Sequence, residues 1–172
     1  YNMVAGDGSV CGTSPAWCLP FHNIYLLYLT HPDRARVARV YPRLAAYLDW
    51  WLRRRTDPEG WLVYKCTWES GEDETPRLDP RATGHGAVFG LIRPAELQAA
   101  VAYSARVLVR LGRELGLAEA EQQRWQAVYE EYRGRTRRMW HPQHACFRDV
   151  DRRTGRFSES EALYWGRDVR QS

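Results

Sequence analysis

The chain has 172 residues, of which 44% are hydrophobic and 27% are charged. That length suffices for one domain with a buried core, and that hydrophobic content excludes a disordered polymer. The longest apolar runs fall far short of the roughly 20 residues that a membrane-spanning helix needs. The net charge of +4 comes from basic residues scattered among acidic ones, which indicates a solvated surface and no nucleic-acid or membrane partner.

The cysteines and the N-terminal residues bear on where the protein works. The four cysteines, Cys11, Cys18, Cys66 and Cys146, are scattered and show neither a disulfide framework nor the paired spacing of a zinc site. We expect them to be reduced. The first residues show no basic start followed by an apolar core, so a secretory signal is either absent or lies outside this sequence, and we expect a cytoplasmic protein.

Hydrophobic spacing predicts two helices in the first third of the chain. The first begins at Pro20, where proline is tolerated in a helix's first turn, and ends at His31. Asp33 can cap the second helix, which runs to about Arg55 and is stopped by the turn residues 56–60. Residues 61–64 then favour a short strand, and residues 65–90 predict a long ordered loop.

A second helical pair is predicted after this loop. Its first helix runs from Pro94 to Gly116, and its partner runs from about Ala118 to Trp140. Residues 147–157 read as a β-hairpin. Strands and helices do not alternate, so a parallel sheet is excluded and the predicted class is mainly α, built from antiparallel helical hairpins.

The densest chemistry lies in residues 65–77, which combine an aromatic side chain, four carboxylates, a lysine and an arginine around Gly71. Enzymes that cleave sugars need a carboxylic acid to protonate the leaving oxygen and an aromatic wall for the sugar's apolar face. This segment could supply both. Lys65 is the only lysine among the 25 basic residues.

Residues 68–77 resemble the signature W-[DE]-S-G-x-D-[DN]-S-P-R of glycoside hydrolase family 63, which is related to the trehalases of family 37. The matching residues are Trp68, Glu69, Ser70, Gly71, Asp73, Thr75, Pro76 and Arg77. The likeness extends to residues 41–51 and 94–99 and to Arg148 and Asp149. These enzymes are six-hairpin glycosidases, so the resemblance implies that the chain forms part of an (α/α)6 toroid with a small β-hairpin near its C-terminus.

The resemblance assigns Asp73 as the general acid of an inverting hydrolysis of an α-linked oligosaccharide or disaccharide. It places Trp68, Glu69 and Arg77 around the sugar subsite. Structural roles stay open for these three: a buried tryptophan, a helix cap and a surface ion pair. For Lys65 we hypothesise that it orients Glu69 or touches substrate, against the alternative of a surface lysine.

Two departures from the family pattern affect this assignment. Glu72 and Glu74 add negative charge, which would raise the pKa of Asp73 if they lie close and partly desolvated, whereas Arg77 would lower it. Six hairpins also need about 250 residues or more. We therefore expect residues 1–172 to form a partial catalytic domain, inactive alone, that requires the remainder of the domain as its partner.

Inverting hydrolysis requires a second carboxylate roughly 6.5–9.5 Å from the acid. In the family this base is a glutamate in a late hairpin, for which the chain offers only Glu159 and Glu161, in a polar segment. No cofactor is expected. A metal site at His141 and His144 is disfavoured because Pro142 breaks helical spacing.

An all-α binding or scaffold domain is the alternative function. In that case the tryptophans would fill a core, as expected for Trp50, Trp51, Trp125 and Trp140 on their predicted helices. Residues 68–77 are the feature that separates the two hypotheses.

Overall fold

A computed structural model describes residues 2–4, 10–13, 19–64, 69 and 91–158, with backbone alone for 2–4, 10–13 and 19. The chain forms two compact units. We call residues 17–56 and 96–138 the helical unit, and residues 1–16, 57–95 and 139–172 the strand unit.

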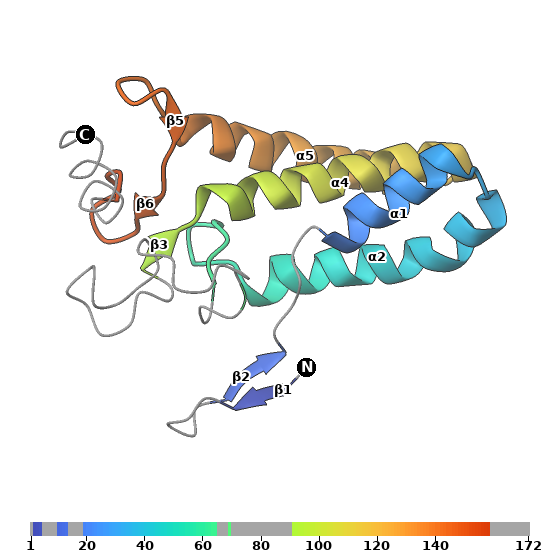
Figure 1. Cartoon of the computed structure of the whole chain (residues 1–172), viewed down its shortest axis with the longest axis horizontal. Helices are drawn as coiled ribbons and strands as arrows, with labels where there is room; N and C mark the ends of the chain where they lie inside the picture. Colours follow the sequence, from blue (N-terminus) through green and yellow to red (C-terminus); the bar gives the residue numbers. More distant parts are fainter. Residues whose placement is uncertain (1, 5–9, 14–18, 65–68, 70–90, 159–172) are drawn as a thin grey trace, which may run out of the picture. The chain divides into compact units, whose positions relative to one another are not determined.

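Four helices make up most of the described chain, as the sequence predicts (Figure 1). Their bounds lie within two residues of the predicted ones: α1 Leu19–Thr30, α2 Arg34–Arg54, α4 Ala95–Leu115 and α5 Glu119–Arg138. Among the described residues, none of these helices combines the length and the apolar character needed to span a membrane.

Local capping sets the ends of these helices. Asp33 caps α2 by accepting a hydrogen bond from the Arg36 N–H at 2.9 Å, and this bond lowers the pKa of the Asp33 carboxyl. Helix α4 ends where Gly116 adopts a positive φ of 67° and the Leu117 N–H donates to the Gly112 carbonyl at 2.9 Å. Both caps occur where the sequence predicts them.

Contacts between side chains fix the directions of the helices in the helical unit. Three hydrogen-bonded side-chain pairs join α1 to α4: His22 with Tyr103, Tyr25 with Arg110, and Tyr28 with Glu114. The residue numbers increase together along both helices, so the two helices are parallel. Helices α1 and α2 form one antiparallel hairpin, and α4 and α5 form another. Alternate helices are therefore parallel, as in stacked αα-hairpins.

The core of the helical unit contains the apolar stripes of α2, α4 and α5. Trp51 is 1% exposed and Trp125 is fully buried. The stripes at 37–51 and 101–115 are buried at most of their large apolar positions, so they leave no broad apolar face exposed.

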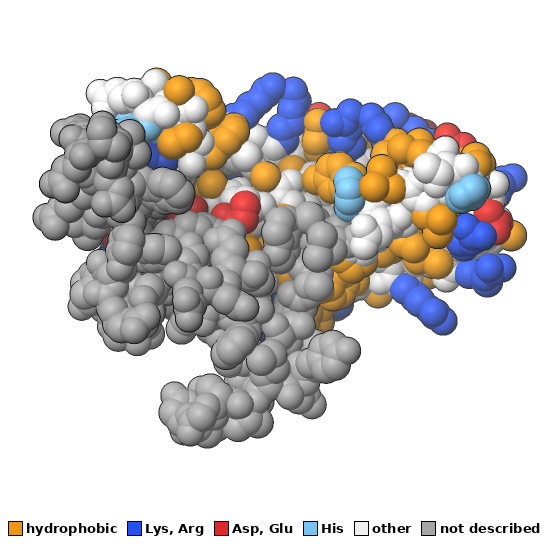
Figure 2. All heavy atoms as spheres, in the orientation of Figure 1, with side chains coloured by type: hydrophobic (Ala, Val, Ile, Leu, Met, Phe, Trp, Pro, Cys, Tyr) orange, Lys and Arg blue, Asp and Glu red, His pale blue; other side chains and the backbone are white. Residues whose placement is uncertain are grey.

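Helix α1 instead carries the exposed apolar surface. Leu26, Leu27 and Leu29 are 45%, 38% and 56% exposed. Hydrophobic side chains gather over α1 in the space-filling view (Figure 2). A helix that is apolar on all sides normally packs against neighbours on all sides.

The strand unit contains short antiparallel pairs. Its strands are β1 Asn2–Val4 with β2 Val10–Thr13, β3 Ile92–Arg93 with β6 Val150–Asp151, and β4 Trp140–His141 with β5 Cys146–Phe147. The small β element near the C-terminus is thus confirmed, although its hairpin is β4–β5. The predicted hairpin at 147–157 is a turn closed by a bridge between Val150 and Phe157.

Two predictions about aromatic segments are wrong. Residues 61–64 form no continuous strand; Leu62 and Tyr64 are buried in irregular backbone that follows the turn at Gly60. Trp140 does not lie on α5, which ends at Arg138, but on β4, where it is 44% exposed.

The Tyr41 hydroxyl on α2 is buried and has no hydrogen-bond partner among the described residues. A Cβ atom at Gly112 would lie 3.3 Å from this oxygen, so glycine makes room for it. Burial, followed by the charge of Glu121, raises the pKa of Tyr41 from 10.0 to about 12.

We predict that Tyr41→Phe raises the free energy of unfolding by about 1 kcal/mol, because it removes a buried unsatisfied hydroxyl. Tyr28→Phe is the control and should lose stability, since the Tyr28 hydroxyl donates to Glu114 at 2.9 Å. Urea titration measures both changes.

The same variant isolates the alkaline behaviour of Tyr41. The unfolded chain releases the phenol proton near pH 10 and the folded chain near pH 12, so this group's contribution to stability falls as the pH rises between them. The wild type should lose more stability than Tyr41→Phe across this range. Equal losses would contradict the buried, unpaired phenol.

Candidate functional site

The predicted site lies almost entirely in a segment that the structure describes at one position. Glu69 belongs to the strand unit and is 1% exposed. A carboxylate at this depth needs polar partners, and Glu69 has interactions of this kind. Lys65, Trp68, Asp73 and Arg77 lie outside the described residues, so their predicted roles remain predictions.

The backbone enters this segment through a turn organised by Asp57. One carboxylate oxygen of Asp57 accepts hydrogen bonds from the N–H groups of Glu59 at 3.0 Å and Trp61 at 2.9 Å. The Asp57 N–H donates to the Trp61 carbonyl at 2.8 Å, and Gly60 takes the positive φ of 87° that the turn requires. Buried Leu62 and Tyr64 follow and fix the chain just before residue 65.

The backbone returns from the segment through β3, which pairs with β6. Ile92 faces Asp151 and Arg93 faces Val150 in antiparallel register. The Arg152 N–H extends this pairing by donating to the Leu91 carbonyl at 2.7 Å. The first described residues after the segment are therefore held by the chain's C-terminal part.

An ion network joins the entry turn to the return strand. The Arg93 guanidinium donates from Nε to one carboxylate oxygen of Asp57 at 2.8 Å and from Nη2 to Glu59, and Nη2 also lies 2.8 Å from the same Asp57 oxygen. The Nε atom of Arg152 lies 3.6 Å from the same Asp57 oxygen and 3.7 Å from Glu59. The Arg93 guanidinium also lies over the Trp61 ring, 5.2 Å from its centroid.

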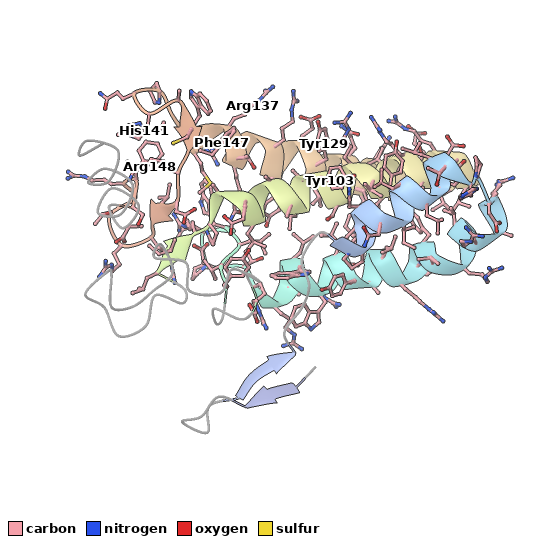
Figure 3. All side chains as sticks on the ribbon, in the orientation of Figure 1. Tyr103, Tyr129, Arg137, His141, Phe147 and Arg148 are labelled. Atoms are coloured by element: carbon pink, nitrogen blue, oxygen red, sulfur yellow. The ribbon has the colours of Figure 1, made fainter. Side chains whose placement is uncertain are left out.

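Arg148 and Asp149 make buried hydrogen bonds, and the one accepted by Asp149 comes from the first residue of helix α4. Asp149 is 1% exposed and accepts a hydrogen bond from the Ala95 N–H at 2.9 Å, which places a carboxylate at the helix's positive end. Arg148, which is labelled in Figure 3, donates to the Ser158 carbonyl at 2.6 Å. The family resemblance at these two residues thus coincides with buried hydrogen bonds within the strand unit.

The β4–β5 hairpin brings the two predicted histidines together. The His141 and His144 rings lie 4.5 Å apart between centroids, and burial, followed by the charge of His144, lowers the pKa of His141. The His144 N–H donates to Nδ1 of His141 at 3.3 Å. Within the described part of the chain, no group of three or more histidine, cysteine or acidic side chains could hold a metal ion.

Sequence reasoning missed the residues that frame the segment. It interpreted Asp57 only as part of a helix stop, and it gave Arg93 no role. One signal could have identified Arg93: a single charge inside the apolar residues 91–95, next to Pro94. A buried charge in such a run requires an opposite charge from elsewhere in the chain.

The fold and the residues 68–77 together define the class as a glycoside hydrolase domain of the helical-hairpin type. A family model, described as the mannosylglycerate hydrolase MGH1-like glycoside hydrolase domain, matches residues 18–164. The chain belongs to this family. No curated protein sequence matches it.

Several solved structures share this fold. A mannosylglycerate hydrolase of glycoside hydrolase family 63 from Thermus thermophilus, in complex with Tris, superposes with a TM-score of 0.68 at 18% identity, over 85% of this chain and 48% of that one. The same enzyme in complex with glucose gives 0.66 at 19% identity, over 86% and 45%. A sialidase gives 0.68 at 13% identity, over 86% of this chain and 13% of that one.

At these identities the likeness concerns the fold. The chain spans about half the length of the Thermus mannosylglycerate hydrolase that it matches. The expected toroid architecture is thereby confirmed at the level of fold.

Proposed function

We propose that the chain forms the part of an inverting glycoside hydrolase that carries the general acid, Asp73. The observation that supports this most directly is the family match over residues 18–164, which includes the whole signature at 68–77. Buried Glu69 within that signature adds support, since a carboxylate fixed in place suits a sugar subsite better than a solvated surface loop.

In this proposal Asp73 donates its proton to the glycosidic oxygen as the bond from that oxygen to the anomeric carbon breaks. A second carboxylate takes a proton from water, whose oxygen attacks the anomeric carbon from the opposite face. Glu72 and Glu74 would help to keep Asp73 protonated near neutral pH. Trp68 would receive the apolar face of the sugar, and Glu69 and Arg77 would bind its hydroxyl groups.

The substrate class is a small α-linked glycoside, either a disaccharide or an oligosaccharide. The family description and the Thermus relative both name mannosylglycerate, which makes this compound the first to test. Less evidence favours the alternative of a binding or scaffold domain, because Trp51 and Trp125 fill the core but Trp140 is exposed.

The exposed leucines of helix α1 favour one partner, the remainder of the same catalytic domain. Its exposed Leu26 and Leu29 are three residues apart and so share one face. The Thermus relative is about twice the length that the chain covers. Further helices of the toroid would bury this face and bring the base opposite Asp73.

The proposed acid is tested by Asp73→Asn in the complete gene product. We expect hydrolysis of mannosylglycerate, or of whichever α-glucoside or α-mannoside is turned over, to fall about 10²–10⁴-fold, because the amide cannot supply the proton. Glu72→Gln is the matched control; it should keep most of the activity and move the alkaline limb of the pH profile to lower pH. Full activity in folded Asp73→Asn would refute the assignment.

Lys65 is tested by Lys65→Arg, which keeps the charge and changes the shape of the donor. If Lys65 touches substrate or orients Glu69, kcat/KM should fall about tenfold or more, as expected for the loss of one charged hydrogen bond. Steady-state kinetics on the folded variant decides the question. Unchanged kcat and KM would leave Lys65 as a surface residue.

The α1 face is tested by Leu29→Glu in the complete gene product. If other helices cover this face, the buried charge should lower the free energy of unfolding by more than about 2 kcal/mol. Ala127→Glu on the exposed side of α5 is the control and should change it by less than about 0.5 kcal/mol. Equal, small effects of both substitutions would show that the α1 face stays open.

A further inference from the structure

Asp57, Glu59, Arg93 and Arg152 form the most heavily connected charged cluster of the strand unit's described residues, and we call it the clamp. Asp57 is the central residue: one carboxylate oxygen organises the entry turn, and the other accepts the Nε bond from Arg93 and lies 2.8 Å from Nη2 of the same guanidinium. Two acids face two guanidinium groups, so the cluster is neutral overall.

Burial makes this pairing specific. The Asp57 side chain is 1% exposed and that of Arg93 is 9% exposed, so removing either charge leaves the other with a more exposed partner, Glu59 for Arg93 and Arg152 for Asp57. The Nε and Nη2 donors of Arg93 belong to one planar guanidinium group, and this group also lies over the Trp61 ring. Lysine at this position would keep the charge but lose both features.

The position of the clamp in the chain suggests its role. Asp57 and Glu59 precede residue 65, and Arg93 follows residue 90, so the ion pair bridges the whole interval 65–90 that contains the proposed acid. Arg152 adds a second contact just after this interval, because its backbone N–H donates to the Leu91 carbonyl. The clamp thus sets the separation and direction of the two ends of that interval.

We propose that the clamp positions the segment that carries Asp73, with Arg93 as its principal positioning residue. Arg93 acts through backbone geometry and makes no contact with the sugar. This inference rests on the proposed function in one respect, namely that residues 65–77 take part in catalysis. A displacement of about 1 Å in a catalytic group can cost about 100-fold in rate, so holding the segment in position has a large effect on turnover.

The chain offers a matched control for a merely structural role. Arg135 on α5 has the same 8% exposure as Arg93. Its glutamate partner Glu131 is 53% exposed, and Glu59 is 58% exposed. Each arginine also lies over an aromatic ring, Tyr132 for Arg135 and Trp61 for Arg93. Arg135 is remote in sequence from residues 65–90, so Arg135→Lys alters an equally buried arginine elsewhere, whose ion-pair partner Glu131 is exposed.

The experiment compares Arg93→Lys with Arg135→Lys in the complete gene product by hydrogen exchange and by kinetics. Arg93→Lys should speed amide exchange in peptides covering 65–90 by about tenfold, as expected for the loss of a charged hydrogen bond, while Arg135→Lys leaves these peptides unchanged. On mannosylglycerate or another hydrolysed glycoside, Arg93→Lys should lower kcat about 10–100-fold and change KM less.

Two outcomes would overturn the proposal: unchanged exchange at 65–90 in Arg93→Lys, or equal effects of Arg93→Lys and Arg135→Lys there. If Arg93→Lys fails to fold, Glu59→Gln provides the milder test, since its side chain is more than half exposed, and it should change exchange in the same direction. Absence of glycoside hydrolysis by the wild type would count against the proposed function alone, because the exchange comparison does not depend on activity.

Discussion

The ion pair between Asp57 and Arg93 is the interaction on which the strand unit depends. Its two side chains are 1% and 9% exposed, so each charge depends mainly on the other for compensation. The pair joins the turn at Asp57 to strand β3 within the strand unit. A second buried carboxylate, that of Asp149, accepts a hydrogen bond from the N–H of Ala95, the first residue of α4. The described backbone on each side of residues 65–90 is therefore held by hydrogen bonds to a buried carboxylate.

The helices were predictable because their signals are local. Asp33, Gly116 and the spacing of Val37, Tyr41 and Leu44 determine caps and stripes from a few neighbouring residues. Exposure was less predictable, since it depends on which helices meet. The stripe of α2 is buried within its own unit, whereas the uniformly apolar α1 leaves leucines exposed.

The frame of the site could not be predicted from local pattern. Arg93 and Asp57 are 36 positions apart, and nothing in either neighbourhood specifies the other as a partner. Residues 61–64 have strand-forming side chains, yet the turn at Asp57 and the burial of Leu62 and Tyr64 override that preference. The density of acidic and aromatic side chains in residues 65–77 points to sugar cleavage, whereas the signature at 68–77 rests on a resemblance to a known family.

The most direct test of the account is a crystal structure of the complete gene product with glucose bound. The account predicts the Asp73 carboxylate within about 2.6–3.2 Å of the anomeric oxygen, in a concave surface with Trp68 against the apolar face of the sugar. Asp73 on a convex surface, pointing into solvent and distant from both Trp68 and Arg77, would contradict it.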